Sequence, residues 1–150
     1  QAKFIEGPMR LTSFTDFALR ALMRLAGEPG RSFATNEIAA EFGISRNHLA
    51  KVVRDLADSG FISTQRGVGG GFTLARPAQS ITIGEVVRAL EGPALVECFR
   101  EDGCNCLLQP RCRLKARLAA AREAFMRELD ATTLAECAYP APSRRIPTPA

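Results

Sequence analysis

The order of the helical and strand-like segments is the feature that most constrains this sequence. Apolar residues recur with helical periodicity in three successive segments, at about 13–26, 35–42 and 45–59. Two strand-like segments, 61–65 and 72–75, then flank the glycine-rich run from Arg66 to Gly71. Helix, helix, short turn, helix and hairpin is the order of a winged helix-turn-helix. We therefore predict a mainly α-helical fold with a small β-hairpin wing.

Polar residues at the starts of these segments suggest where the helices begin. Ser13 is expected to open the first helix, and Thr35 and Ser45 are good N-caps for the next two. Thr82 is a candidate cap for a fourth helix over 83–90. The expected inner face of the first helix consists of its large apolar residues Phe14, Phe17, Leu19, Leu22, Met23 and Leu25.

Basic and polar residues occupy the side of the third helix that its apolar stripe leaves free. In a helix-turn-helix, the first turns of this helix enter the major groove. Arginine and lysine there contact phosphates or guanine, and asparagine can contact adenine. A glycine-rich wing tip can approach a phosphate or the minor groove closely. The DNA-binding candidates are Ser45, Arg46, Asn47, His48, Lys51, Arg54, Arg66, Gly69 and Gly70.

Charge alone does not establish DNA binding. The formal net charge is +4, and a lone basic helix face is more often simply solvated. The ordered set of segments favours DNA binding over that alternative. No catalytic group pairs with His48, the only histidine, so we do not expect an enzyme.

Four of the five cysteines lie close together, at Cys98, Cys104, Cys106 and Cys112. The sequence has no apolar run long enough to cross a bilayer and does not begin like a secretion signal. We therefore expect a cytoplasmic protein with reduced thiols, which suit zinc or an iron–sulfur cluster. A structural zinc site usually contains Cys-x2–4-Cys pairs. Gaps of five and seven residues favour a cluster, and zinc or reactive thiols remain alternatives.

The longest predicted helix, about 112–129, follows the cysteines and has one apolar seam. The seam consists of Leu114, Leu118, Ala121, Phe125 and Leu129. It could fold onto its own domain, or it could pair with the same helix of a second copy. DNA-binding proteins of this kind usually form dimers, which place two recognition helices in successive major grooves.

The sequence divides into five segments. We expect an N-terminal extension at 1–8, the DNA-binding domain at 9–80, a short helix with the cysteine loop at 81–111, a dimerisation helix at 112–137 and a disordered tail at 138–150. Cys137 is expected to pack as a small apolar residue.

Several separate motifs, in the same order, resemble one known family. They are MRLTSFTDFALR at 9–20, GISRNHL at 43–49, RGVGGG at 66–71, LVEC at 95–98, CRLK at 112–115 and LDATTL at 129–134. These motifs resemble the iron–sulfur winged-helix transcriptional regulators of bacteria, which include NsrR, RirA and IscR. The resemblance is greatest to the nitric-oxide-sensing branch, NsrR.

The resemblance implies a homodimeric repressor that releases its DNA operator when nitric oxide attacks an iron–sulfur cluster, [4Fe-4S] rather than [2Fe-2S]. By the same resemblance, the cluster ligands are Cys98, Cys106 and Cys112, with Cys104 as an alternative middle ligand. The resemblance adds Asp16 of the partner subunit as a fourth ligand. A simpler role for Asp16 is a capping box with Ser13.

Two features depart from that assignment. The seven-residue gap between Cys98 and Cys106 also resembles RirA, an iron-responsive repressor. Lys115 stands where IscR carries a histidine. An iron- or cluster-status sensor is therefore the main alternative, and a zinc-stabilised DNA-binding module without sensing is the next.

Overall fold

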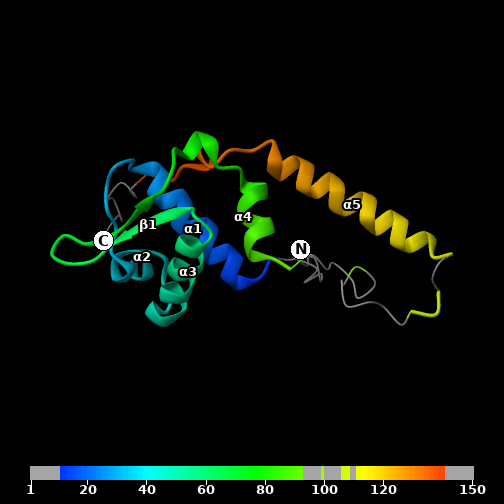
Figure 1. Cartoon of the computed structure of the whole chain (residues 1–150), viewed down its shortest axis with the longest axis horizontal. Helices are drawn as coiled ribbons and strands as arrows, with labels where there is room; N and C mark the ends of the chain where they lie inside the picture. The colour runs from blue at the N-terminus through cyan, green and yellow to red at the C-terminus, as the bar shows by residue number, and fades with distance from the viewer. Residues whose placement is uncertain (1–10, 93–98, 100–105, 109–110, 141–150) are drawn as a thin grey trace, which may run out of the picture.

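The computed structural model describes residues 11–92, 99, 106–108 and 111–140. These residues form helices and one antiparallel hairpin, as predicted (Figure 1). The α-helices are α1 (Ser13–Gly27), α2 (Thr35–Phe42), α3 (Arg46–Asp58), α4 (Ile83–Leu90) and α5 (Arg113–Asp130). The strands are β1 (Ile62–Gln65) and β2 (Gly71–Leu74), and the short 3-10 helices are η1 (Ala78–Ser80) and η3 (Ala135–Cys137). No helix of the described residues is long and apolar enough to span a membrane.

The core lies where α1 packs against α3 and α4, and α2 packs against α3. The predicted apolar stripe of α3 is confirmed at Leu49, Val52 and Leu56, which are fully buried, and its fourth residue, Val53, is partly buried. The predicted inner face of α1 is only partly correct. The buried face of α1 consists of Thr15, Ala18, Ala21, Leu22, Arg24, Leu25 and Ala26. Phe14, Phe17, Leu19 and Met23 are only partly buried, because small residues let α1 approach its neighbours closely.

Two of the three predicted N-caps, Ser45 and Thr82, are correct. The Ser45 hydroxyl accepts a hydrogen bond from the His48 N–H, and Thr82 forms a full capping box with Glu85. The helix α1 begins at Ser13, as predicted, and its N-cap is Thr12, whose hydroxyl accepts a hydrogen bond from the Thr15 N–H. The α2 cap is Ala34, which makes no side-chain hydrogen bond, so the prediction of Thr35 was wrong.

The hairpin forms a wing that is joined to the loop between α1 and α2. The strands β1 and β2 pair in the register Ile62↔Leu74 to Gln65↔Gly71. Phe33 extends this sheet, because its N–H and C=O both bond to the backbone of Phe72 at 3.0 and 2.9 Å. The Phe33 and Phe72 side chains are buried, so the base of the wing belongs to the core.

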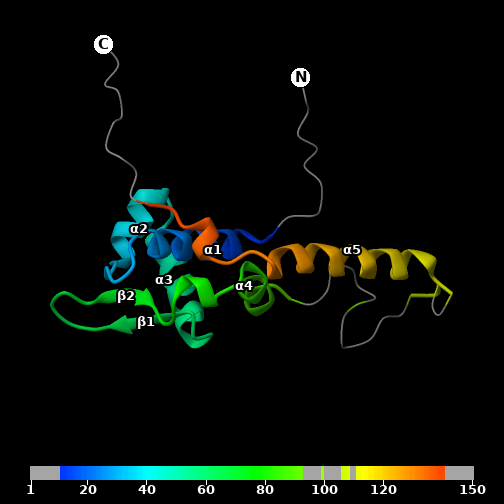
Figure 2. The same cartoon turned by 90° about the horizontal axis from the view of Figure 1, so that it is seen from above.

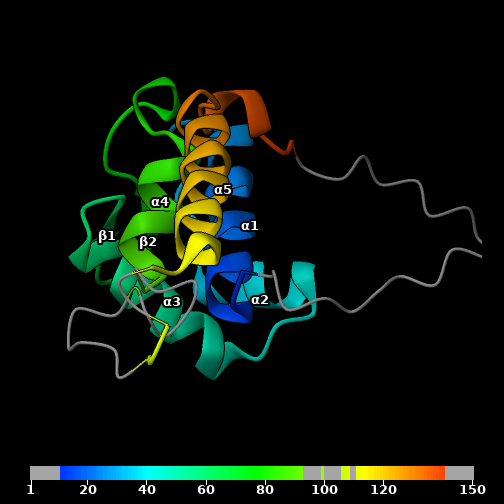
Figure 3. The ribbon, with the colours of Figure 1, turned by 90° about the vertical axis from the view of Figure 1, so that its right-hand side faces the viewer.

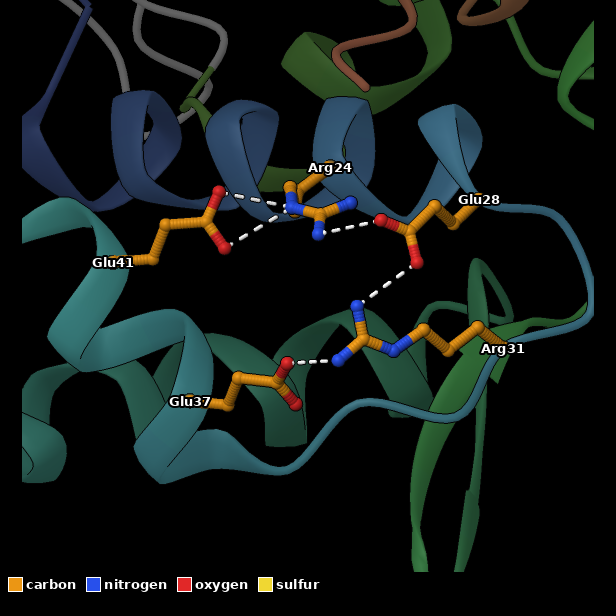
Figure 4. Close-up of polar contacts among 5 residues, drawn as sticks. All are labelled: Arg24, Glu28, Arg31, Glu37 and Glu41. Carbon is orange, nitrogen blue, oxygen red and sulfur yellow. Dashed lines mark hydrogen bonds and ion pairs between the residues drawn. The ribbon is translucent and has the colours of Figure 1, made fainter. Parts of the chain in front are cut away.

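A buried arginine connects α1 to α2 and to the loop between them (Figure 4). Arg24 is 2% exposed; its Nε donates to both Glu41 oxygens at 2.9 and 3.0 Å, and Nη2 donates to Glu28 at 2.8 Å. Arg31 donates to Glu28 at 2.9 Å and also pairs with Glu37. Burial lowers the pKa of Arg24, but the hydrogen bonds and charges of Glu28 and Glu41 outweigh it and raise the pKa. The network therefore holds a charged side chain where α1, α2 and the loop between them meet.

The long helix α5 is anchored at its C-terminal end only. Met126 is buried, and Arg88 of α4 pairs with Asp130 through two hydrogen bonds, one of 2.6 Å. Figures 1 and 2 show the rest of α5 extending beyond the body, and Figure 3 looks along it onto α4 and α1. Along the outer part, Leu114 is 63% and Phe125 40% exposed. Within the described residues, the seam therefore packs on the rest of the chain at Leu129 and leaves Leu114 and Phe125 largely uncovered.

Several predictions fall outside the described residues. They are the extension at 1–8, the cysteines Cys98 and Cys104, and the tail from residue 141. Residues 138–140, which we expected to begin a disordered tail, lie against α1, since the Tyr139 N–H donates to the Met23 carbonyl at 2.8 Å. The predicted boundaries of the five segments remain predictions.

Candidate nucleic-acid interface and metal site

The turn into α3 is short and built from local interactions. Gly43 ends α2 with a positive φ of 63°, which favours glycine. The Ile44 N–H then bonds to the Ala39 carbonyl at 2.9 Å, and the Ile44 side chain is buried. Ser45 caps α3 directly afterwards. This geometry fixes the direction in which the first turn of α3 points.

The outer face of α3 carries the predicted DNA-binding side chains. Arg46, Asn47, His48, Lys51 and Arg54 are all exposed, as is the cap Ser45. Within the described residues, none of the basic side chains of this face forms an ion pair. The arginines of the surrounding elements, Arg20, Arg24, Arg31, Arg76 and Arg88, are all paired with carboxylates. The α3 face therefore keeps positive charge available for a polyanion.

The wing tip is built on glycines that few other residues could replace. Gly67 and Gly69 have φ values of 103° and 76°. A side chain at Gly70 would meet the Gln65 carbonyl oxygen at 2.6 Å. Arg66 is exposed beside this turn. The backbone of the glycine turn can therefore approach another surface closely.

Sequence reasoning missed Val68 at the wing tip. Its side chain is fully exposed, at 111%. An apolar side chain at a protruding tip suits contact with the sugars or bases of a minor groove. Its position in the middle of the glycine run was the available signal.

A shallow cleft of about 210 Å³ lies between the start of α1 and the outer side of α3. Ser13, Phe14 and Phe17 line it from α1, and His48 and Lys51 line it from α3. His48 and Lys51 therefore border α1 as well as the face that we assign to DNA. The two phenylalanines that we expected in the core instead lie at this surface.

Asp16 lies on the exposed side of α1. Its carboxylate pairs with Arg20 one turn later at 2.8 Å, and both side chains are 45% exposed. Because Thr12 is the cap, Asp16 lies beyond the N3 position and forms no capping box with Ser13. The capping box with Ser13 is therefore wrong, but Asp16 remains an acidic residue in the first turn of α1, where it favours the helix dipole, and its carboxylate is partly exposed.

Two of the three described cysteines, Cys106 and Cys112, lie before and at the outer end of α5, and the third, Cys137, lies in η3. Cys112 is the N-cap residue of α5, with a partly exposed side chain that makes no capping hydrogen bond. Cys106 is exposed, and Cys98 and Cys104 lie outside the described residues. Within residues 11–92, 99, 106–108 and 111–140, no three His, Cys, Asp or Glu side chains are grouped as a metal site. The accessible thiols at Cys106 and Cys112 are soft donors, which fit an iron–sulfur cluster or zinc.

Glu91 connects the start of α1 to the end of α4, where the chain leads into the cysteine segment. Its carboxylate accepts from the N–H and hydroxyl of Thr12 at 2.7 and 2.9 Å. Desolvation raises the pKa of Glu91, but the hydrogen bonds from Thr15 and Thr12 outweigh it and leave the pKa below its ordinary value. The ionised carboxylate therefore stabilises this junction.

Comparison with known proteins places the whole described unit in one family. Residues 11–139 match the model of the Rrf2 family, described as an iron-dependent transcriptional regulator. The chain belongs to the Rrf2 family. Members of this family are DNA-binding transcriptional regulators rather than enzymes, and they are typically dimeric. The winged-helix prediction is thereby confirmed.

Solved structures of other Rrf2 regulators match this fold. CymR of Staphylococcus aureus is 28% identical, with a TM-score of 0.68 over 88% of this chain and 100% of that one. CymR (YrzC), described as the global cysteine regulator of B. subtilis, is 26% identical, with a TM-score of 0.71 over 87% and 96%. IscR of T. potens, at 23% identity, has a TM-score of 0.68 over 85% of each chain and shows the shared fold alone. These matches support the Rrf2 family and do not single out the nitric-oxide-sensing branch.

Proposed function

We propose that this Rrf2 protein is a homodimeric repressor that binds operator DNA through α3 and the wing and releases it when nitric oxide reacts with an iron–sulfur cluster. The observation that carries the DNA-binding part is the contrast among its basic residues. Those on α3 and Arg66 form no ion pair within the described part of the chain, while the arginines of the surrounding elements do. Unpaired lysine and arginine on a convex helix face suit phosphate contacts.

The dimer would form along α5, and its charges favour an antiparallel pair. From 113 to 122 the helix carries Arg113, Lys115, Arg117 and Arg122 and no acidic residue. Its other half carries the acidic residues Glu123, Glu128 and Asp130 and one basic residue, Arg127. An antiparallel pair places each basic half beside the acidic half of the partner and covers the exposed Leu114 and Phe125.

The same pairing supports a cluster shared between subunits. The Cys112 end of α5 extends beyond its own body (Figure 1), so an antiparallel pair places it over the body of the partner. The cluster would be held by Cys98, Cys106 and Cys112, with Cys104 as the alternative middle ligand and Asp16 of the partner subunit as the fourth. When bound, an iron–sulfur cluster of the [4Fe-4S] type supplies iron that reacts with nitric oxide.

Arg20 gives the Asp16 carboxylate an alternative partner. In the described structure the two form an ion pair at 2.8 Å. An Asp16 carboxylate oxygen that held the cluster would give up its bond to Arg20, so Arg20 would compete with the cluster for Asp16. Because both side chains are 45% exposed, this ion pair is weak and the exchange costs little. A hard carboxylate is also a poor ligand for an iron otherwise held by thiolates, so it is easily displaced.

An iron- or cluster-status sensor is a second candidate function. The family description as iron-dependent and the seven-residue spacing between Cys98 and Cys106 favour it. Both functions use the same ligands and the same DNA surface, and they differ in the signal that releases DNA.

The ligand assignment is tested with a matched pair of cysteine variants purified without oxygen. Cys112→Ala should lose the cluster absorbance together with iron and sulfide. Cys137→Ala should keep all three, because Cys137 packs partly buried against the core. Nitric oxide and an iron chelator, added separately to the loaded protein, then distinguish the two signals by their effect on operator binding. A colourless wild-type protein with stoichiometric zinc would eliminate both sensing functions.

A further inference from the structure

The chain after α5 returns along the molecule instead of ending at the dimerisation helix. Figure 2 shows this segment running from the end of α5 along α1 toward α2. We call residues 131–139 the C-terminal strap. Near its start, the Ile83 N–H donates to the Thr132 carbonyl at 2.9 Å, and the Leu134 N–H donates to the Ile81 carbonyl at 2.8 Å. Leu134 is fully buried, so this part of the strap is fixed to the start of α4.

The far end of the strap lies directly on α1. The Tyr139 N–H donates to the Met23 carbonyl at 2.8 Å. A Cβ atom at Gly27 would come within 2.0 Å of the Tyr139 carbonyl oxygen, which is part of the backbone and cannot swing away. Glycine at position 27 is therefore what allows the strap to lie against the end of α1.

The Tyr139 side chain crosses from α1 to α2. Its ring contacts Phe42 with 6.4 Å between the ring centroids, at an angle of 47°. Phe42 is the last residue of α2, and Gly43 begins the turn into α3. The strap therefore ends against the residue that precedes the turn of the helix-turn-helix.

We propose that Tyr139 is a positioning residue for DNA recognition, because it holds the end of α2, and with it the turn into α3, relative to α5. The other end of the strap follows Asp130, which is tied to α4 by Arg88. The strap thus connects α5 to the end of α2. This connection is additional to the one through α4, which packs on α1. The proposal rests on α3 as the DNA-binding helix and is independent of the cluster.

A purely stabilising role makes a different prediction. Tyr139 is 43% exposed, so removing its ring costs limited burial. If the ring only stabilised the fold, a variant that remains fully folded would bind DNA like the wild type. If it positions α2 and α3, affinity falls although the protein is folded.

The test measures operator affinity of the full-length protein across a salt series, with DNA obtained by in vitro selection. Tyr139→Ala should bind roughly three- to tenfold more weakly at a temperature where circular dichroism shows it folded. Its salt slope should match the wild type, because no phosphate contact is removed. Tyr139→Phe keeps the ring and should restore affinity. Full affinity in folded Tyr139→Ala would overturn the proposal.

Two further measurements keep the test decisive. Gly27→Ala pushes the strap off α1 without changing a strap residue, and it should weaken affinity like Tyr139→Ala; wild-type affinity would count against the proposal. Tyr139 is the only tyrosine, so 3-fluorotyrosine gives one fluorine resonance. Phe42→Leu should move that resonance, and an unmoved resonance would show that the ring contact does not form. Lys51→Ala reports separately on α3, since it should reduce the salt slope while Tyr139→Ala does not.

Discussion

The helices α3 and α5 are both amphipathic, but their apolar sides differ in how far they are buried. In α3 the residues Leu49, Val52 and Leu56 are fully buried in the core of this chain. In α5 Leu114 and Phe125 remain 63% and 40% exposed, and only the end near Met126 is packed. The apolar side of α3 is thus satisfied within the chain, which leaves its basic side for an external partner. For α5 it is the apolar side itself that needs a partner.

This difference assigns two kinds of partner to two kinds of surface. The basic face of α3 forms no ion pair within the described residues, and the apolar side of the helix is buried. Such a face suits a polyanion such as DNA. An exposed apolar seam with charges of opposite sign at its two ends suits a second copy of the helix. Family membership agrees with both assignments, since Rrf2 regulators bind DNA and are typically dimeric.

The largest effect that we expect is a difference between truncating a leucine on the apolar side of α3 and truncating one on the apolar side of α5. Leu49→Ala should lower the free energy of unfolding by about 2–5 kcal/mol, because it leaves a cavity in a closed core. Leu114→Ala should chiefly weaken the dimer, so its destabilisation should shrink as protein concentration rises. Denaturant titrations at several concentrations, with sedimentation equilibrium, separate the two. If Leu114→Ala behaved like Leu49→Ala at every concentration, the seam would not be an interface.

The next largest effect is a difference in the salt dependence of DNA binding between a lysine variant on α3 and one on α5. Lys51→Ala on α3 should weaken operator binding and reduce the log–log salt slope by about 0.9, the value of one phosphate contact on duplex DNA. Lys115→Ala removes the same charge from α5 and should leave the slope unchanged. Fluorescence anisotropy over a salt series measures both. Equal slopes for Lys51→Ala and the wild type would remove Lys51 from the DNA interface.

The smallest expected effect concerns Glu91, which connects the start of α1 to the end of α4. The pKa of Glu91 is depressed in the folded protein, so its ionised form stabilises folding above the unfolded value of about 4.3. That contribution is lost as the pH falls below this value and through the folded pKa. Glu91→Gln should therefore be less stable than the wild type at pH 7, with the difference shrinking on acidification. Thermal unfolding at pH 7 and below pH 4 measures this, and a constant difference would contradict the assignment.

The helix-turn-helix formed by α2 and α3 could be predicted from the sequence because its signals are local. Ser45, Gly43 and the stripe on α3 each act within one or two turns of helix, and the structure confirms them. The α1 cap was missed because Thr12 also donates to Glu91, which lies far along the chain. The buried face of α1 was partly missed because close packing selects small alanines there over the large Phe14 and Phe17.

Other features could not be predicted because they depend on distant contacts. Nothing in the local sequence indicates that Arg24 is buried, since its partners Glu28 and Glu41 come from two different elements. The strap likewise depends on the meeting of Tyr139 with Gly27 and Phe42. The cysteine ligands remain a prediction, because Cys98 and Cys104 lie outside the described residues.

The most direct test of the account is the fraction of operator DNA bound by the wild-type dimer, purified without oxygen, before and after nitric oxide is added. We predict a brown protein that binds its operator and releases it once nitric oxide has reacted. Unchanged binding by a protein shown to hold iron and sulfide would contradict the central claim.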